Sequence, residues 1–274
     1  MARKRYGLDE KRIKRFTREG RGAGTGKHYK PWLTVSDVPS LGRVHRVFCP
    51  KTGREHHLLS DNEYYAFLLQ WWDDNVIDIR EQFPLIDRRE TLEIAARCGV
   101  RHPVDPASGA LWVITTDLLV TIRTTCSIET VAYTVKQAEE LRKERTLEKL
   151  DIERRYWERR EVRWNILTDR QVKNTFTKNL AWILNPNELH SQTPTCTDID
   201  IAVRYALAEE QRTQPFAPIR LVCRTADQRL DCKAGTALAS LRRLLGAKLV
   251  RVDLHARSLY DLPIQAFSIL GGEI

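Results

Sequence analysis

The sequence has no run of apolar residues long enough to cross a membrane, and no apolar stretch of the signal-peptide type follows its charged start. Its six cysteines, at positions 49, 98, 126, 196, 223 and 232, are scattered without any C-x-x-C spacing. That distribution favours neither a zinc site nor a disulfide framework, and it fits a protein of the reducing cytoplasm. No arrangement of serine, histidine and aspartate, or of cysteine and histidine, indicates a nucleophilic triad.

Basic residues gather near the N-terminus. The net charge is +9, yet residues 1–30 alone hold 11 lysines and arginines against 3 acidic residues. Such segments bind polyanions by releasing counterions, so we expect a basic N-terminal arm that contacts DNA rather than one that serves only solubility. The residues expected to contact phosphates are Lys11, Arg12, Lys14 and Arg15.

Two segments rich in β-branched and aromatic residues, 111–122 and 128–136, predict neighbouring strands. Asp117 lies on the first strand. Thr134 and Lys136 lie on the second, with their side chains on one face because strand residues alternate between faces. An acid beside a lysine on the next strand is typical of a metal-dependent phosphodiesterase, in which the acid holds a divalent ion and the lysine steadies the attacking water. The alternative is an ordinary surface pair of aspartate and lysine.

Glu63 is a candidate for a second carboxylate ligand. Ser60 and Glu63 have the spacing of a capping box at the start of a helix predicted over residues 61–73. Glu63 either bonds back to the start of its own helix or faces the strand pair as a metal ligand. Magnesium prefers hard oxygen ligands, so two carboxylates and a backbone carbonyl suffice.

The pattern of elements predicts a layered α/β fold in the N-terminal part of the chain. The expected strands are 76–83, 111–122, 128–136 and 162–168, and the expected helices are 61–73, 138–160 and 174–184. Residues 86–110 are expected to form a loop or short helix, and the polar, proline-bearing segment 185–194 a linker. The glycine-rich segment 22–27 lacks the residues of a phosphate-binding loop, and we expect a flexible hinge there.

The C-terminal part predicts a small winged-helix module. Helices are expected from 197 to 210 and from 236 to 245, followed by a strand over 248–254 that turns at 255–258 into a hairpin with residues 259–262. Arg242 and Arg243 lie off the apolar stripe of the second helix, where they could meet DNA phosphates. The alternative is a module that binds protein, since its net charge is close to neutral.

Several long strings in this sequence resemble TnsA, a family of transposon-end endonucleases from heteromeric cut-and-paste transposons. The resemblance covers most of the chain and rests on residues 20–27, 31–35, 56–61, 78–85, 144–150 and 154–157. It implies a restriction-endonuclease-like mixed sheet flanked by helices, followed by the small winged-helix domain. The implied organisation is a basic arm over residues 1–30, a catalytic domain over 31–186 and a C-terminal domain over 187–274.

The resemblance also implies which residues form the active site. The family's acidic, acidic, glutamine and lysine positions fall on Glu63, Asp117, Thr134 and Lys136. Thr134 departs from the family, which has Gln or Glu there, and its hydroxyl group is a shorter and weaker metal ligand. The third ligand is therefore either Thr134 or the carbonyl of Val135. Glu153 falls on a further family glutamate near the site. The alternative interpretation of Glu153 is an ordinary solvated charge on a helix, which is the commoner case.

The implied function is that of a Mg²⁺-dependent DNA endonuclease subunit that cuts the 5′ strand at transposon ends. The implied partners are double-stranded DNA, a DDE-type transposase that processes the 3′ strand, and an AAA+ regulator that docks on the C-terminal domain. Two alternatives stay open at this point. One is a stand-alone nuclease of the restriction or resolvase type, and the other is a catalytically weak architectural subunit that bridges transposase and regulator.

Overall fold

The computed structural model describes residues 9–38, 42–184 and 197–269, which form two compact units that divide between Lys173 and Asn174. The sequence placed this boundary at residue 186, and the expected linker, residues 185–194, lies outside the described residues. The boundary falls earlier because α6 (Thr175–Ile183) packs with α9 (Thr236–Gly246) of the second unit. The side chain of Arg242 in α9, for example, donates to the carbonyl of Trp182 at 2.7 Å.

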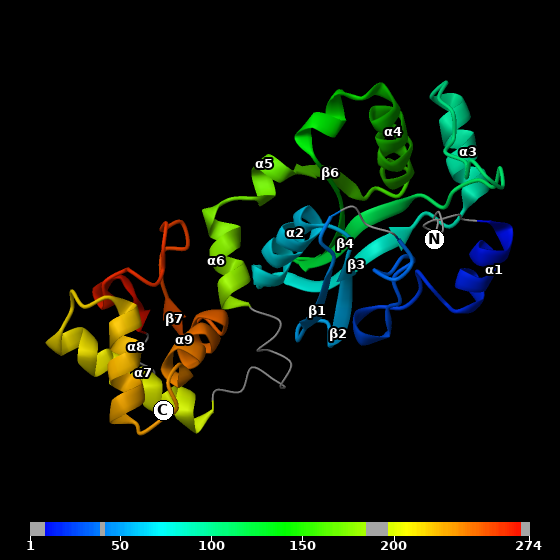
Figure 1. Ribbon diagram of the computed structural model, residues 1–274. Coiled ribbons are helices and arrows are strands. Elements are labelled where there is room, and N and C mark those ends of the chain that lie inside the picture. Colours follow the sequence, from blue (N-terminus) through cyan, green and yellow to red (C-terminus); the bar gives the residue numbers. More distant parts are fainter. Residues whose placement is uncertain (1–8, 39–41, 185–196, 270–274) are drawn as a thin grey trace, which may run out of the picture. The chain divides into compact units, whose positions relative to one another are not determined.

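The first unit is built on a four-stranded mixed sheet, as expected, with the order β3–β4–β5–β6 (Figure 1). The strands are β3 (Val76–Pro84), β4 (Thr115–Arg123), β5 (Ile128–Lys136) and β6 (Arg163–Thr168). The first three strands are antiparallel to one another, and β6 runs parallel to β5. β4 starts four residues later than expected because Leu111 and Trp112 pair with Val104 and Pro103 instead of with the sheet.

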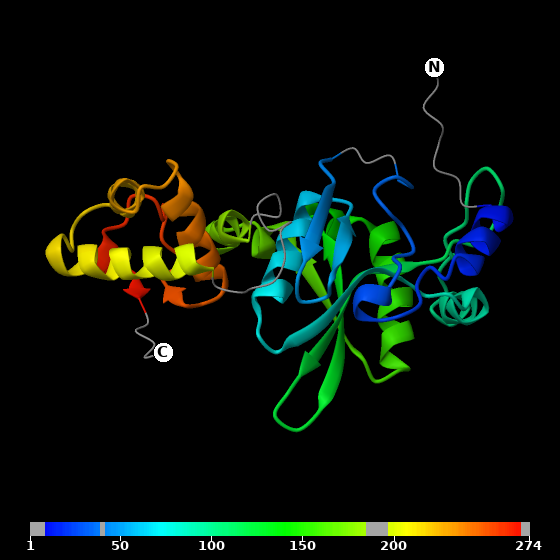
Figure 2. The ribbon, with the colours of Figure 1, turned by 90° about the horizontal axis from the view of Figure 1, so that it is seen from below.

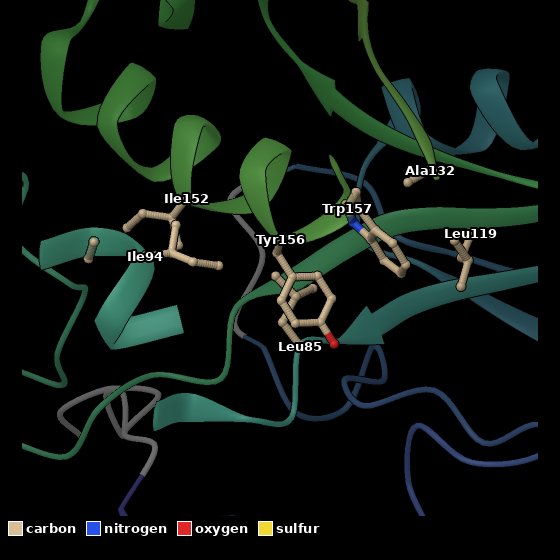
Figure 3. Packing of buried hydrophobic residues seen from close by; sticks show 8 residues of the cluster. Leu85, Ile94, Leu119, Ala132, Ile152, Tyr156 and Trp157 are labelled. Atoms are coloured by element: carbon tan, nitrogen blue, oxygen red, sulfur yellow. The ribbon is translucent and has the colours of Figure 1, made fainter. Parts of the chain in front are cut away.

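Helices cover both sides of this sheet. α2 (Asp61–Trp72) contacts β3, β4 and β5, whereas α4 (Glu144–Glu158) lies on the opposite side (Figures 1 and 2). On the α4 side a buried apolar cluster joins the sheet to α3 and α4 (Figure 3). Its members are Leu85, Ile94, Ala95, Leu119, Ala132, Ile152, Tyr156 and Trp157.

Two of the expected helical regions differ in detail from the structure. The segment expected as a loop or short helix contains α3 (Arg88–Arg97), which packs against α4. The single helix expected over 138–160 is divided into a 3-10 helix, Ala138–Arg142, and α4. A short helix, α5 (Asp169–Val172), ends the first unit.

A hairpin that was not predicted, β1 (His45–Cys49) and β2 (Arg54–Leu58), packs on β3 through a buried carboxylate. Glu81 of β3 is fully buried and accepts hydrogen bonds from Arg54 at 2.8 Å and from the His57 amide at 3.1 Å, and its other oxygen lies 2.8 Å from His56. Burial opposes the charge on Glu81, but His56 and Arg54 outweigh that cost and hold its pKa well below the ordinary value. This network fixes the hairpin to β3.

Part of the basic segment is a folded element of the first unit. α1 (Glu10–Arg18) buries Ile13 and Phe16 against Trp32 and Val113. The rings of Phe16 and Trp32 meet edge to face with their centres 5.3 Å apart. The expectation of a separate basic arm is therefore wrong from residue 10 onward. Residues 1–8 lie outside the described part of the chain.

The expected hinge at residues 22–27 is also wrong, because the glycines form a tight turn packed against β3. Gly22 has a φ of 80°, and a Cβ atom at this position would approach the ring of Pro84 to 2.2 Å. Its amide donates to the carbonyl of Lys30 at 2.6 Å. Glycine is required here both by the left-handed backbone and by the close approach of β3.

The second unit places three mutually packed helices before a short strand pair. Its described elements besides α6 are α7 (Asp198–Thr213), α8 (Ile219–Arg229), α9, β7 (Val250–Arg251), a 3-10 helix (Ile264–Ala266) and β8 (Ser268–Ile269). The expected hairpin with residues 259–262 is wrong, since β7 pairs antiparallel with β8. Each strand is two residues long, and the winged helix stays a prediction. In the described ranges of both units, no helix has the length and apolar composition needed to span a membrane.

Asp200 joins α7 to α9 inside the second unit. Its buried carboxylate accepts hydrogen bonds from Ser240 and Arg243, each at 2.6 Å, and it closes a capping box with Thr197. Burial opposes the negative charge, but the hydrogen bonds from Arg243 and Ser240 outweigh it and lower the pKa of Asp200 to about 2. The ion pair therefore contributes stability only while Asp200 is ionised.

We expect this contribution to disappear in acid. Because the pKa of Asp200 in the folded chain, about 2, lies below the ordinary 3.8, its stabilisation is present above pH 3.8 and is lost as the pH falls toward 2. Asp200→Asn should lower the unfolding temperature at pH 6, and the gap to the wild type should close as the pH approaches 2. Asp198→Asn, at an exposed position on the same helix, is the matched control. A gap for Asp200→Asn that stays constant over this range would contradict the assignment.

Candidate active site

A cleft of about 480 Å³ in the first unit brings together the acidic residues and the lysine that the sequence indicated. Its lining includes Glu63 of α2, Asp117 of β4, Val135 and Lys136 of β5, and Glu153 of α4. Since β4 and β5 are antiparallel, the start of one strand lies beside the end of the other, which places Asp117 next to Val135 and Lys136. The three acids are 8%, 8% and 3% exposed, in chain order, so all three are buried.

Asp117 is held by the end of β5. One carboxylate oxygen, Oδ2, accepts the Val135 amide at 2.7 Å and the Lys136 ammonium group at 3.2 Å. The same ammonium group donates to the carbonyl of Val135 at 3.0 Å. Burial alone would lower the pKa of Lys136, but the carboxylates of Asp117 and Glu153 outweigh burial and raise it. Lys136 therefore stays charged over the neutral pH range.

Glu63 caps its helix and lines the cleft at the same time, so the two interpretations of this residue are compatible. Its Oε1 accepts the Ser60 hydroxyl at 2.9 Å, and its Oε2 accepts the Leu59 amide at 3.0 Å. Burial, followed by the nearby charge of Asp117, raises the pKa of Glu63 to about 7. A carboxyl group with that pKa can exchange a proton near neutral pH.

Glu153 is a buried member of the site, so its interpretation as a solvated helix charge is wrong. Its Oε1 accepts the hydroxyl groups of Thr116 at 2.7 Å and Thr134 at 2.5 Å. Burial, followed by the charge of Asp117, raises the pKa of Glu153 to about 7. The charge of Asp117 therefore disfavours ionisation of Glu153.

Thr134 is 1% exposed, and its hydroxyl group links two other residues. It donates to Glu153 and accepts the indole N–H of Trp164 at 3.2 Å. The sequence pattern placed this side chain toward Asp117, whereas its hydrogen bonds in the structure join it to α4 and β6. This position accordingly supports Glu153, and the role of Thr134 as a metal ligand stays a prediction.

Gln82 is a residue of the site that sequence reasoning missed. It is 3% exposed on β3, and its amide nitrogen lies 3.3 Å from both Glu63 Oε2 and Asp117 Oδ1. Its backbone has a φ of 48°, which is unusual for a residue other than glycine. No spacing rule selects this residue, because a lone glutamine between a charged and an aromatic residue carries no signal of function.

The cleft offers oxygen ligands suited to a small divalent cation. Glu63 and Asp117 each place a carboxylate oxygen 3.3 Å from the amide nitrogen of Gln82, and Val135, whose carbonyl accepts Lys136, lines the same cleft. No cluster of three or more His, Cys, Asp or Glu side chains in metal-binding geometry occurs among the described residues. Two carboxylates completed by a carbonyl and water match the preference of Mg²⁺, which keeps several of its waters.

The basic residues predicted to bind DNA have different surroundings. Lys11, Lys14 and Arg15 of α1 are exposed, whereas Arg12 is partly buried and pairs with Asp37 at 3.1 Å. Arg242 is only 9% exposed and bonds to Trp182, so the expectation that it lies off the buried face of α9 is wrong. Arg243 pairs with Asp200. These contacts show that both arginines stabilise the second unit, and their binding to DNA stays a prediction.

Comparison with known proteins identifies the family of this chain. Residues 73–169 match the family described as TnsA-like endonuclease N terminal, and residues 171–254 match TnsA endonuclease C terminal. The two matches meet close to the division between the compact units. The chain is 38% identical over 255 residues to the transposon Tn7 transposition protein TnsA of Escherichia coli, an alignment that covers 93% of this chain and 90% of that protein. This chain therefore belongs to the TnsA family of endonucleases.

Proposed function

We propose that this protein is the Mg²⁺-dependent endonuclease subunit of a transposase and that it cuts the 5′ strand at transposon ends. The observation that carries the proposal is the cleft in which Asp117 lies within hydrogen-bonding distance of Lys136, with Glu63 and Glu153 beside them. The similar protein from Escherichia coli is named as a transposition protein, which supports DNA ends as the substrate. Cleavage would leave a 5′-phosphate and a 3′-hydroxyl group.

Asp117, Glu63 and the carbonyl of Val135 would hold the metal. A bound Mg²⁺ supplies positive charge to the phosphate and lowers the pKa of a coordinated water. Asp117 is fixed for this role by the Val135 amide, which binds Oδ2, while its Oδ1 and Glu63 Oε2 both accept from the amide nitrogen of Gln82. The burial of both carboxylates limits competition from bulk water and strengthens their attraction for a cation.

Lys136 would orient the attacking water and stabilise the negative charge that develops on the phosphate. Its ammonium group is held by Asp117 and by the Val135 carbonyl, so it is already directed into the cleft before substrate arrives. Preorganised charge of this kind needs no rearrangement during the reaction. Glu153, with a pKa of about 7, is suited to accept or return a proton at the cleft wall.

The proposal includes partners for both units. A DDE-type transposase would process the 3′ strand, and an AAA+ regulator would dock on the second unit, which we predict to be a winged helix. The face of α1 formed by Lys11, Lys14, Arg15 and Arg18 would contact DNA phosphates, since these exposed residues follow helical spacing opposite the buried Ile13 and Phe16. Cys49 and Cys223 are buried free thiols, which fits the proposed location in a reducing cytoplasm.

The first prediction from this proposal tests the roles of Asp117 and Lys136. Asp117→Asn should reduce metal-dependent cleavage about 10³-fold or more, because it removes the charge that anchors the metal while preserving side-chain shape. Lys136→Ala should cause a comparable loss of rate, yet it should leave Mg²⁺ binding close to that of the wild type. Strand-specific nicking of a transposon-end duplex, measured with the partner transposase, gives the rates, and calorimetry gives metal affinity. Undiminished 5′-strand cleavage by the Asp117→Asn variant would contradict the proposal.

The second prediction concerns Thr134. Thr134→Val keeps the shape of the side chain but removes the donor to Glu153 and the acceptor for Trp164, so cleavage should fall about tenfold with a higher Mg²⁺ midpoint. Thr134→Ser retains the hydroxyl group and is the matched control, with near wild-type behaviour expected. The rates are to be measured across a Mg²⁺ titration. A valine variant with an unchanged rate and midpoint would remove Thr134 from the site.

The third prediction concerns the exposed face of α1. Neutralising Lys11, Lys14, Arg15 and Arg18 to glutamine should weaken DNA binding and make its salt dependence shallower, by about 0.9 in log–log slope for each phosphate that is no longer neutralised. Exchanging lysine for arginine, and arginine for lysine, at the same four positions keeps the charge and is the control. Substitution is preferable to deletion of the segment, because deletion would also remove Ile13 and Phe16 from the core. An unaltered slope in the glutamine variant would show that this face does not bind DNA.

A further inference from the structure

We propose that Gln82 is a positioning residue that holds Glu63 and Asp117 together in the arrangement that a divalent cation requires. The inference rests on the proposed metal site and adds to it a neutral side chain that does not itself react. Gln82 lies on β3, whereas the two acids belong to α2 and β4. Its amide group therefore connects three separate elements at one point.

The hydrogen bonds of Gln82 fix the orientation of its amide group. The nitrogen of the amide donates to Glu63 Oε2 and Asp117 Oδ1, each 3.3 Å away, which suits ionised carboxylates because these only accept hydrogen bonds. The amide oxygen is left to accept, and it takes the hydroxyl group of Thr115 at 3.0 Å. One donor group is thus shared by two acids that would otherwise repel each other.

The backbone of Gln82 is held in a conformation that glutamine rarely adopts. Its φ of 48° lies in the left-handed region, which is strained for a residue with a side chain. The surrounding structure maintains it, since the carbonyl of Gln82 accepts the Trp32 amide at 3.2 Å while Glu81 and Phe83 pair with Leu118 and Thr116 of β4. Such strain persists where the neighbours impose it, and it is concentrated at functional sites.

The position of the amide nitrogen indicates the role of the strained backbone at Gln82. The amide hydrogens carry partial positive charge and are donated to one oxygen of each carboxylate, the kind of oxygen that a cation would also contact. Gln82 thus holds both acids by hydrogen bonds when no cation is present, which lowers the cost of assembling the ligands upon binding. Partners that orient metal ligands in this way typically change metal affinity by about 10–100-fold.

The test compares Gln82→Gly with the wild type in the full-length protein. Glycine adopts a φ of 48° without strain, so this variant removes the amide but not the backbone conformation. Unfolding temperature is measured across a Mg²⁺ titration, with Asp117→Asn as the baseline for non-specific binding. We expect the Mg²⁺ concentration at the midpoint of this titration to be about tenfold higher for Gln82→Gly than for the wild type. Cleavage at saturating Mg²⁺ should remain close to the wild-type rate. Thr115→Val, which removes the hydroxyl that orients the amide, should shift the midpoint in the same direction by less.

Gln82→Glu provides an independent readout because it replaces the shared donor with a third carboxylate of nearly equal shape. Without metal this variant should unfold at a lower temperature than the wild type. Mg²⁺ should then raise its unfolding temperature by more than it raises that of the wild type. This variant decides the matter if Gln82→Gly fails to fold. If these variants respond to Mg²⁺ as the wild type does, the role proposed for Gln82 is wrong, while the proposed nuclease function is unaffected. Absence of any Mg²⁺ response above the baseline in the wild type itself would instead overturn the proposed metal site.

Discussion

The site depends on placing three carboxylic acids in one buried cleft, where each negative charge raises the cost of the others. An ionised carboxylate removed from water is unstable unless donors or cations surround it. The structure supplies the Val135 amide and Lys136 to Asp117, and two threonine hydroxyl groups to Glu153. Glu63 and Glu153 nevertheless have pKa values raised to about 7, so their charge is only partly compensated by the protein. This imbalance is the basis of the proposal that the cleft binds a divalent cation.

The geometry of that cleft depends on residues far from it in the sequence. β3 carries Gln82 into the site, and two segments brace this strand on either side of Gln82. The hairpin β1–β2 holds Glu81 through Arg54, and the N-terminal segment packs Gly22 against Pro84. The same N-terminal segment contains the exposed basic face of α1. A single folded segment therefore both supports β3 and presents exposed basic residues, which an arm separate from the fold could not do.

The sequence predicted the local features and missed those that depend on tertiary contacts. Alternation and β-branched composition located β3, β5 and β6 closely, and the capping box located α2. Asp117 and Lys136 could be singled out because adjacent strands were recognisable. Gln82 and Glu81 could not, since their importance arises from a left-handed backbone and from a hairpin that docks from another part of the chain. α1 was mistaken for part of a separate basic arm because its charge outweighs the two buried residues, Ile13 and Phe16, that anchor it.

The central claim is that Asp117, Glu63 and the Val135 carbonyl form a cation site in this cleft. The most direct measurement is a crystal structure of the protein soaked with Mn²⁺, read by anomalous scattering. The account predicts a peak within about 2.0–2.6 Å of an oxygen of Asp117, with Glu63 and the Val135 carbonyl in the same coordination shell, at distances typical of hard divalent cations. A peak elsewhere, or none at concentrations that support cleavage, would contradict it.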